Sequence, residues 1–264
     1  MTELVRSVIL GIVQGLTEFL PVSSSGHLEI ARFLLNDPAV GEQGLFFTIM
    51  VHLATALATL FVFRKDIAEL LRGLFTKRWN EAKAFVIYII ISMIPAAVVG
   101  FTLEPLIARM FEQRIVFVGI MLCVTAVLLY LADKAQRTDR DVTPGRALVI
   151  GVAQAIAIIP GISRSGATIA TSVLLGIDRY KASRFSFLMV VPLILGKVAY
   201  DLVQGEMGAI DVQGGHLIAA FIAAFVSGAL ACRWMVALVR HSKLRYFSVY
   251  CIVLGIFAII LVSL

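Results

Sequence analysis

Residues 14–27 read QGLTEFLPVSSSGH. The carboxylate of Glu18, the imidazole of His27 and three consecutive serines interrupt an otherwise apolar segment that extends from residue 4 to residue 35. Each half of this segment is shorter than the roughly 20 residues that a membrane-spanning helix needs. A broken apolar segment of this kind is typical of a helical hairpin that enters and leaves the membrane on one face, with its tip buried in protein or lining a wet cavity.

The composition places this hairpin in an integral membrane protein. The 264 residues are 60% hydrophobic and 15% charged, whereas soluble domains are about 45–50% apolar and about 25% charged. These values exclude a cytosolic globular enzyme. The net charge of +6 is attributed to membrane orientation rather than to nucleic acid, for which we expect no binding. The predicted fold class is an all-α integral membrane protein with six transmembrane helices, over 45–63, 84–103, 115–132, 185–200, 217–232 and 246–264.

A second broken segment, residues 146–177, carries PGISRSGAT at positions 160–168 and predicts a second re-entrant hairpin. At a constant offset of 140 residues the chain also matches itself, at Gly11 and Gly151, Gln14 and Gln154, Ser23 and Ser163, Ser25 and Ser165, Gly26 and Gly166, Leu34 and Leu174, Leu35 and Leu175, Phe47 and Phe187, Val51 and Val191, and Leu53 and Leu193. This similarity predicts a single membrane domain made of two repeats, 1–132 and 141–264. Because each repeat has three spans, we expect the second to be inverted, with both tips meeting near the bilayer midplane.

Basic residues predict the orientation, because cytoplasmic loops are enriched in Lys and Arg. Seventeen of the 23 Lys and Arg residues lie in the connections 64–83, 133–146, 177–184 and 233–245. The connection 201–216 has none. We therefore expect these four basic connections to be cytoplasmic, and both termini and the opening of the first hairpin to face outward.

Ionisable side chains in apolar surroundings are costly, and they are therefore candidates for function. Glu18, His27 and Arg164 are the main candidates because they sit beside the breaks rich in serine and glycine. His52, on a uniformly apolar span, and Lys197, near a helix end, are weaker ones. The structural alternative is an ion pair between Glu18 and Arg164 that only holds the two hairpins together.

The two tips offer the groups that bind an anion. Glycines at 26 and 166 allow close approach of the backbone, and the helices that follow the breaks point N–H groups into the expected cavity. Arg164 adds a planar fork suited to phosphate oxygens. Hydroxyl groups come from Ser23, Ser24, Ser25, Ser163 and Ser165. We therefore expect an anionic, phosphate-bearing ligand at membrane depth.

Glu18 would repel a phosphate unless a cation lay between them. A divalent cation, Mg²⁺ or Ca²⁺, held by a carboxylate and diphosphate oxygens would resolve this conflict. Ser24 precedes His27 by three residues, so both would share one face of a helix that begins near the serines. A Ser–His pair beside an arginine predicts phosphoryl transfer. The alternative is a helix-capping serine with a histidine that merely lines the cavity.

The segments 14–27 and 160–168, with their spacing and the sequence FSFL at 185–188, resemble the signature motifs of the undecaprenyl-diphosphatase family, the bacitracin-resistance lipid phosphatases of bacteria. The resemblance covers the whole chain. It implies hydrolysis of undecaprenyl diphosphate to the monophosphate at the outer face of the plasma (inner) membrane. This reaction recycles the lipid carrier of cell-wall synthesis and confers bacitracin resistance, and the resemblance also implies a divalent cation.

Carried over residue by residue, the resemblance implies specific roles. Glu18 would be the essential acid and a metal ligand, Arg164 would hold phosphate, and Ser24 and His27 would be the nucleophile and its partner in either order. The family's Glu/Gln-x-x-x-Glu pattern starts with Gln14 here, so Gln14 would be a second metal ligand through its carbonyl. The substrate pocket would be lined by Gln14, Ser23, Ser25, Gly26, Ser163, Ser165, Gly166 and Thr168. The partners expected are undecaprenyl diphosphate and membrane lipid, and a homodimer is allowed.

Two other functions fit part of the pattern. The acid-phosphatase-like lipid phosphatases share the Ser-Gly-His and Ser-Arg elements, but the histidine that they require six residues after the arginine is Ala170 here. A transporter or flippase would use the same broken helices and inverted repeats. A carrier, however, has little use for Glu18 and His27 beside Ser24. Phosphate release by purified protein in detergent separates the enzyme from the carrier.

Overall fold

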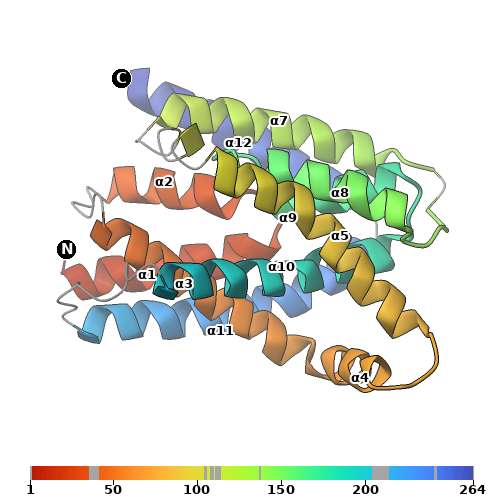
Figure 1. The fold of residues 1–264 in the computed structure, drawn as a ribbon. Coiled ribbons are helices and arrows are strands. Elements are labelled where there is room, and N and C mark those ends of the chain that lie inside the picture. Colours follow the sequence, from red (N-terminus) through yellow and green to blue (C-terminus); the bar gives the residue numbers. More distant parts are fainter. Residues whose placement is uncertain are drawn as a thin grey trace.

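In the computed structural model, the described residues are 2–35, 42–103, 106–107, 110, 114–136, 138–203, 214–240 and 243–263. The architecture is all-helical (Figure 1), with one isolated bridge between Arg140 and Ile177 in the described residues. The helices are α1 (Glu3–Phe19), α2 (Ser24–Leu34), α3 (Glu42–Val62), α4 (Arg64–Leu74), α5 (Glu81–Thr102), α7 (Ile115–Asp133), α8 (Pro144–Ile156), α9 (Arg164–Leu174), α10 (Arg179–Val203), α11 (Gly214–Arg240) and α12 (Leu244–Ser263).

Five of these helices are long and apolar enough to cross a membrane, namely α5, α7, α10, α11 and α12. A sixth candidate is α3, which passes the same test together with α4 although the pair is bent by 76°. Apolar side chains such as Val249, Val253 and Ile256 on α12 are exposed, as expected for helices surrounded by lipid. Within the described residues, the structure therefore has five or six membrane-capable helices, where the sequence predicts six.

The two predicted hairpins are pairs of short helices, α1 with α2 and α8 with α9. The first break runs from Leu20 to Ser23, and Ser23 has a φ of +70°. The second break contains Gly161, whose φ of +93° is readily adopted only by glycine. Helix α9 begins at Arg164. After each break a new helix therefore begins in the middle of the bundle, and its first N–H groups are exposed there.

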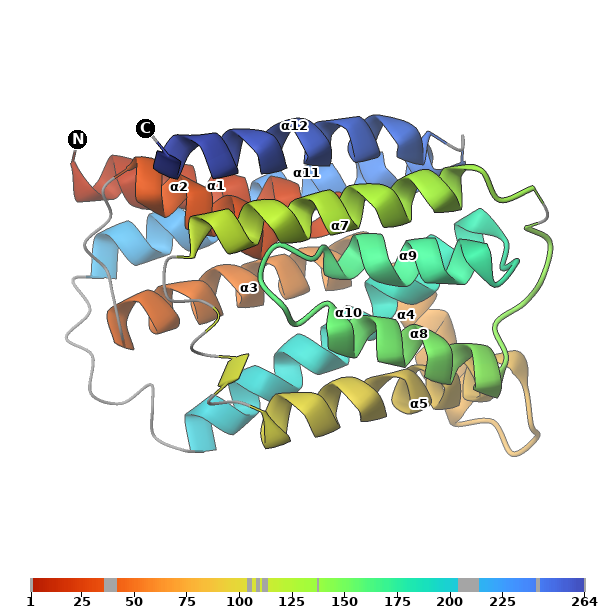
Figure 2. The same cartoon turned by 90° about the horizontal axis from the view of Figure 1, so that it is seen from above.

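The packing of these helices follows the repeat. Helix α1 packs along α11, α8 along α5, and α7 along α12 (Figure 2). The matched glycines Gly11 and Gly151 make equivalent contacts, the first with the backbone of Ala220 on α11 and the second with that of Ser92 on α5. At the crossing of α7 and α12, a Cβ on Gly119 would lie only 2.6 Å from the carbonyl oxygen of Gly255. Close backbone approach therefore fixes all three pairs.

The core lies around the two hairpins. Phe19 at the end of α1 packs edge-on against Phe187 of α10 at a ring-centroid distance of 5.9 Å, and Phe63 lies beside the same ring. Cys232 and Cys251 are buried and Cys123 is half-buried, and all three are free. Free cysteines in such surroundings act as small apolar core residues.

The structure differs from the sequence analysis in the connection 64–83 and at two span ends. Residues Arg64–Leu74 form helix α4 rather than a loop, and α10 and α11 extend beyond the predicted 185–200 and 217–232. Both extensions contain basic residues, which stop an apolar pattern without stopping a helix. Spans predicted from hydropathy alone are therefore shorter than these two helices.

Candidate active site

The carboxylate of Glu18 is the centre of the polar cluster. Glu18 occupies the last turn of α1 and is 6% exposed. Its Oε2 atom accepts hydrogen bonds from the Ser24 hydroxyl at 2.6 Å and from Gln14 Nε2 at 2.9 Å. Gln14 lies four residues earlier, on the same face of α1. The first hairpin thus brings Gln14, Glu18 and Ser24 together without help from the rest of the chain.

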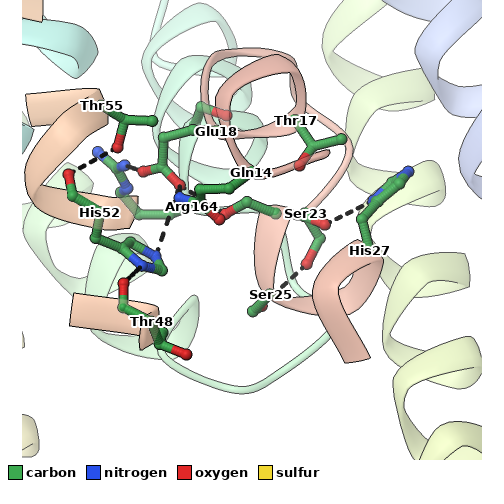
Figure 3. Close-up of polar contacts among 12 residues, drawn as sticks. Gln14, Thr17, Glu18, Ser23, Ser25, His27, Thr48, His52, Thr55 and Arg164 are labelled. Carbon is green, nitrogen blue, oxygen red and sulfur yellow. Dashed lines mark hydrogen bonds and ion pairs between the residues drawn. The ribbon is translucent and has the colours of Figure 1, made fainter. Parts of the chain in front are cut away.

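Arg164 joins this cluster from the second hairpin. As the first residue of α9, it donates from Nη2 to Glu18 Oε1 and forms a partly buried ion pair (Figure 3). The Ser165 hydroxyl also donates to the carbonyl of Leu20 at 3.0 Å. The two tips, far apart in sequence, therefore meet at Glu18. Loss of either charge would leave the other unpaired, at a cost of about 3–5 kcal/mol for a buried pair.

The serines on each side of the breaks cap the helices that follow. The hydroxyl of Ser23 accepts from the N–H of Gly26 at 3.2 Å, and that of Ser163 accepts from Gly166 at 3.0 Å. A Cβ on Gly26 would lie 3.3 Å from Gly161 Cα. A Cβ on Gly166 would contact the side chain of Ser163 and lie 3.3 Å from the carbonyl oxygen of Pro21. The two helix N-termini, each with positive dipole character, therefore come close together and favour an anion between them.

His27 faces away from the Glu18 cluster. Its Nδ1 bonds the carbonyl of Ser23 at 2.7 Å, and its Nε2 lies 2.7 Å from the hydroxyl of Tyr250 on α12. The His27 and Tyr250 rings are stacked at 5.6 Å. Helix α2 does begin at Ser24, as the expected shared face requires. The Ser24 hydroxyl nevertheless donates its hydrogen bond to Glu18, and His27 pairs with Tyr250.

His52 lies on the opposite side of Glu18, as Figure 3 shows. It comes from α3, and its Nδ1 donates to the Thr48 carbonyl at 2.8 Å, which leaves Nε2 facing Glu18 Oε2 at 3.8 Å. By sequence His52 is one of the weaker candidates, although it is an ionisable residue within an apolar span. Tyr250 was not identified, because a tyrosine in an apolar helix carries no motif.

Other predicted pocket residues lie behind this layer. Thr168 is fully buried; its hydroxyl donates to the Arg164 carbonyl at 2.9 Å and lies 2.6 Å from that of Ser186. Ser25 and Ser165 each lie 3.3 Å, hydroxyl to hydroxyl, from the capping serine of their own hairpin. These groups shape the tips and support Arg164. Lys197 belongs to α10, but its side chain is not among those that the structure describes.

The repeat separates structural from chemical positions. Residues that are identical in both hairpins, such as the capping serines and the glycines, build the tips. Residues that differ between the copies carry the ionisable groups. These pairs are Glu18 and Ile158, Ser24 and Arg164, His27 and Ala167, and His52 and Pro192. The site is therefore asymmetric: the first hairpin supplies the acid and the hydroxyl, and the second supplies the cation.

For a divalent cation, the donors available are few. Among the described residues, no three His, Cys, Asp or Glu side chains come together. The Oε1 atom of Gln14 is buried without a hydrogen-bond partner, beside the carboxylate of Glu18. One carboxylate and one amide oxygen fit a hard cation whose other ligands are diphosphate oxygens and water. The donor set does not fit a cation caged by protein alone.

The chain is similar to known proteins over nearly its whole length. The family model described as bacitracin resistance protein BacA matches residues 7–257. A protein named undecaprenyl-diphosphatase from Christiangramia forsetii is 55% identical over 258 residues, which is 98% of each chain. The undecaprenyl-diphosphatase of Bacteroides fragilis is 46% identical over 266 residues, 99% of each chain. Undecaprenyl-diphosphatase 3 of Bacillus anthracis is 38% identical over 267 residues, 97% of each chain.

Proposed function

This chain belongs to the bacitracin resistance protein BacA family, and we propose that it hydrolyses undecaprenyl diphosphate to undecaprenyl monophosphate and inorganic phosphate. The observation that carries the proposal is the carboxylate of Glu18, which binds the Ser24 hydroxyl through one oxygen and Arg164 through the other. This arrangement places a nucleophile, its proton acceptor and a phosphate-binding cation around one point.

In the proposed reaction, Glu18 accepts the proton of Ser24 as the Ser24 oxygen bonds to the terminal phosphorus. The bond from that phosphorus to the bridging oxygen breaks, and the lipid monophosphate leaves. Water then attacks the phosphorus of the phosphoserine, the bond from the Ser24 oxygen to phosphorus breaks, and Glu18 returns its proton to that oxygen as phosphate leaves. A guanidinium has five N–H donors, so Arg164 can bind phosphate oxygens and stabilise the charge that develops on them. Helix N-termini at Ser24 and Arg164 add N–H donors. The geometry favours Ser24 over His27, whose two ring nitrogens bond Ser23 and Tyr250.

The reaction is tested by phosphate release from undecaprenyl diphosphate with purified protein in detergent and Mg²⁺ or Ca²⁺. We expect multiple turnovers, because hydrolysis needs no membrane compartments. A transporter or flippase would bind the lipid in the same micelles and release no phosphate. That result would refute the proposed enzyme.

A divalent cation is proposed to arrive with the diphosphate and to bind Glu18 and the orphan oxygen of Gln14. When bound, it would neutralise diphosphate charge. We expect Gln14→Leu to weaken the apparent affinity for Mg²⁺ by about tenfold, as loss of a supporting metal contact does. The measurement is the Mg²⁺ dependence of phosphate release, together with direct titration of Mn²⁺ binding by electron paramagnetic resonance in the presence of a non-hydrolysable diphosphate analogue.

The matched control for this experiment is Gln154→Leu, at the equivalent position of the second hairpin. Gln154 is also buried, but residue 158 is isoleucine where the first hairpin has Glu18. We expect this variant to keep the cation affinity of the wild type. If both substitutions change cation affinity equally, Gln14 is not a ligand.

His52 is expected to contribute from its position beside Glu18. Replacement by alanine should lower kcat/KM by about 10²-fold, the lower end of the range for a proton-transfer group, because Nε2 faces the oxygen that binds Ser24. His52→Gln should retain part of the activity. Thr55→Val is the control, since the Thr55 hydroxyl contacts only the backbone carbonyl of His52 among its recorded bonds. Equal rates for His52→Ala and the wild type would exclude this contribution.

The membrane arrangement is also proposed: six spans and two re-entrant hairpins in two inverted repeats, 1–132 and 141–264. The equivalent glycine contacts and serine caps of the two hairpins support it. Figure 1 places both chain ends at one end of the bundle and α4 at the other. With the basic connections in the cytoplasm, both termini and the opening of the active site face outward in the plasma (inner) membrane. The homodimer remains a prediction.

The same orientation gives the cellular role that we propose. Hydrolysis at the outer face would return the lipid carrier to cell-wall synthesis. It would also confer bacitracin resistance, as the description of the family model suggests. A short-chain prenyl diphosphate that reached the site only from the cytoplasmic face of oriented vesicles would contradict this orientation.

A further inference from the structure

The turn between α4 and α5 is built by its own side chains. Asn80 donates from Nδ2 to the carbonyl of Gly73 at 2.8 Å and to the Thr76 hydroxyl at 2.6 Å. The Thr76 hydroxyl also bonds the Gly73 carbonyl, and Asn80 Oδ1 accepts from the N–H of Lys83 at 3.0 Å, which caps α5. A turn with this many internal hydrogen bonds holds one backbone conformation.

This ordered turn holds two large aromatic side chains outside the protein. Phe75 is 89% exposed and Trp79 is 71% exposed. Leu71, in the last turn of α4, is half exposed on the same connection. Aromatic side chains of this size are normally buried when a protein folds in water. At the boundary of a membrane, tryptophan is instead favoured at the level of the lipid headgroups.

The surroundings of these aromatic residues are basic. Residues 64–83 contain six Lys and Arg side chains and three acidic ones. Among the acidic three, Asp66 is paired with Arg184 of α10 at 2.7 Å. Lys77 and Arg78, between the two aromatics, are both exposed. The charge presented beside Phe75 and Trp79 is therefore positive.

The bend between α3 and α4 directs α4 across the end of the bundle. Helix α4 bends by 76° from the end of α3, and its label in Figure 1 lies at the end of the bundle opposite the chain termini. Ile67 and Leu70 of α4 pack against the core. The inner side of α4 is therefore held against the protein, and Leu71, Phe75 and Trp79 are the exposed apolar side chains that can enter a membrane interface.

We propose that α4 and the Phe75–Trp79 turn form an interfacial anchor that binds the anionic phospholipids of the adjoining leaflet. The aromatic rings enter the headgroup region, and Lys77 and Arg78 contact the lipid phosphates. An anionic membrane surface matches both the apolar and the positive parts of this site, whereas either part alone would fit many partners. The inference is independent of the proposed phosphatase reaction.

The protein contains two tryptophans, so Trp234→Phe leaves Trp79 as the reporter. This variant is reconstituted into vesicles that carry brominated phosphatidylcholine or brominated phosphatidylglycerol. We expect bromine near the headgroup end of the chains to quench Trp79 more than bromine near the chain ends. We also expect the anionic lipid to quench more than the zwitterionic one at equal mole fraction. Adding Lys77→Gln and Arg78→Gln should reduce this preference by about fivefold for each charge removed.

The reciprocal variant Trp79→Phe leaves Trp234 on α11 as the fluorescent reporter. Quenching of Trp234 verifies that the brominated lipids act as quenchers in these vesicles. Phosphate release in detergent checks that each variant is folded, because none of these residues lies in the candidate active site. Strong quenching of Trp79 by aqueous iodide, with none by brominated lipid, would overturn the proposal and point to a soluble protein partner. Equal quenching by both brominated lipids would overturn the selection of anionic lipid.

Discussion

Replacing Arg164 by alanine is expected to lower kcat/KM for undecaprenyl diphosphate by about 10³-fold or more, in the range found when an arginine that stabilises a phosphoryl-transfer transition state is removed. Arg164 is the cation in contact with Glu18 and begins a helix whose N–H groups face the same site. Its loss removes the donors that match charge on the transferred phosphate. Steady-state phosphate release from the purified variant measures the effect.

Two controls separate this chemistry from folding. Arg184→Ala breaks a different ion pair, the one with Asp66 near the α4 end of the bundle, and it should leave kcat/KM nearly unchanged. Arg164→Lys retains the charge without the planar fork and should recover only part of the activity. Thermal unfolding in detergent reports whether the unpaired Glu18 destabilises the alanine variant. A folded Arg164→Ala protein with the activity of the wild type would contradict the assigned role.

Replacing Ser24 by alanine is expected to abolish the covalent intermediate and to lower kcat by about 10³-fold or more, since a nucleophile and its proton acceptor act as a unit. Ser24 is assigned as the nucleophile because its hydroxyl donates a 2.6 Å hydrogen bond to Glu18. Substrate with a labelled terminal phosphate is added, and the reaction is stopped rapidly. Label that stays on the protein then reveals the phosphoenzyme. A bond to serine survives acid, whereas one to histidine does not.

The neighbouring Ser23→Ala is the matched control, because Ser23 caps α2 through the N–H of Gly26. It should cost stability, about 0.5–2 kcal/mol for a lost cap, and retain the phosphoenzyme. An acid-labile intermediate that persists in Ser24→Ala and disappears in His27→Ala would show that the histidine attacks phosphorus. The Ser24 mechanism would then be wrong.

The sequence was most informative where polar residues break apolar segments. Pro21 with the serines, and Gly161 with Arg164, allowed both hairpins to be located, because buried irregular backbone needs such residues and exposes its polar groups inside the protein. An ion pair between Glu18 and Arg164 was the structural alternative suggested by the cost of isolated charges in lipid, and the meeting of the two tips was expected from the inverted repeats. The structure shows these two residues in contact.

Contacts that depend on the rotation of whole helices are absent from the sequence-based predictions. The approach of His52 to Glu18 requires α3 to present one particular face, and the stacking of Tyr250 on His27 requires the same of α12. On α3 a signal existed, because the polar residues Thr48, His52, Thr55 and Thr59 recur at helical spacing and share one face. Helix α4 was missed because its short amphipathic pattern lies among charges that mark a loop.

The central claim is that residues of the two hairpins form one active site, and a double-mutant cycle on Glu18 and Arg164 tests it most directly. kcat/KM is measured for Glu18→Gln, Arg164→Gln and the double variant. If the two residues act as a unit, the double variant should retain activity within about tenfold of the less active single variant, since each single change already disables the site. Losses that multiply in full would mean that Glu18 and Arg164 act independently, and the shared site would be refuted.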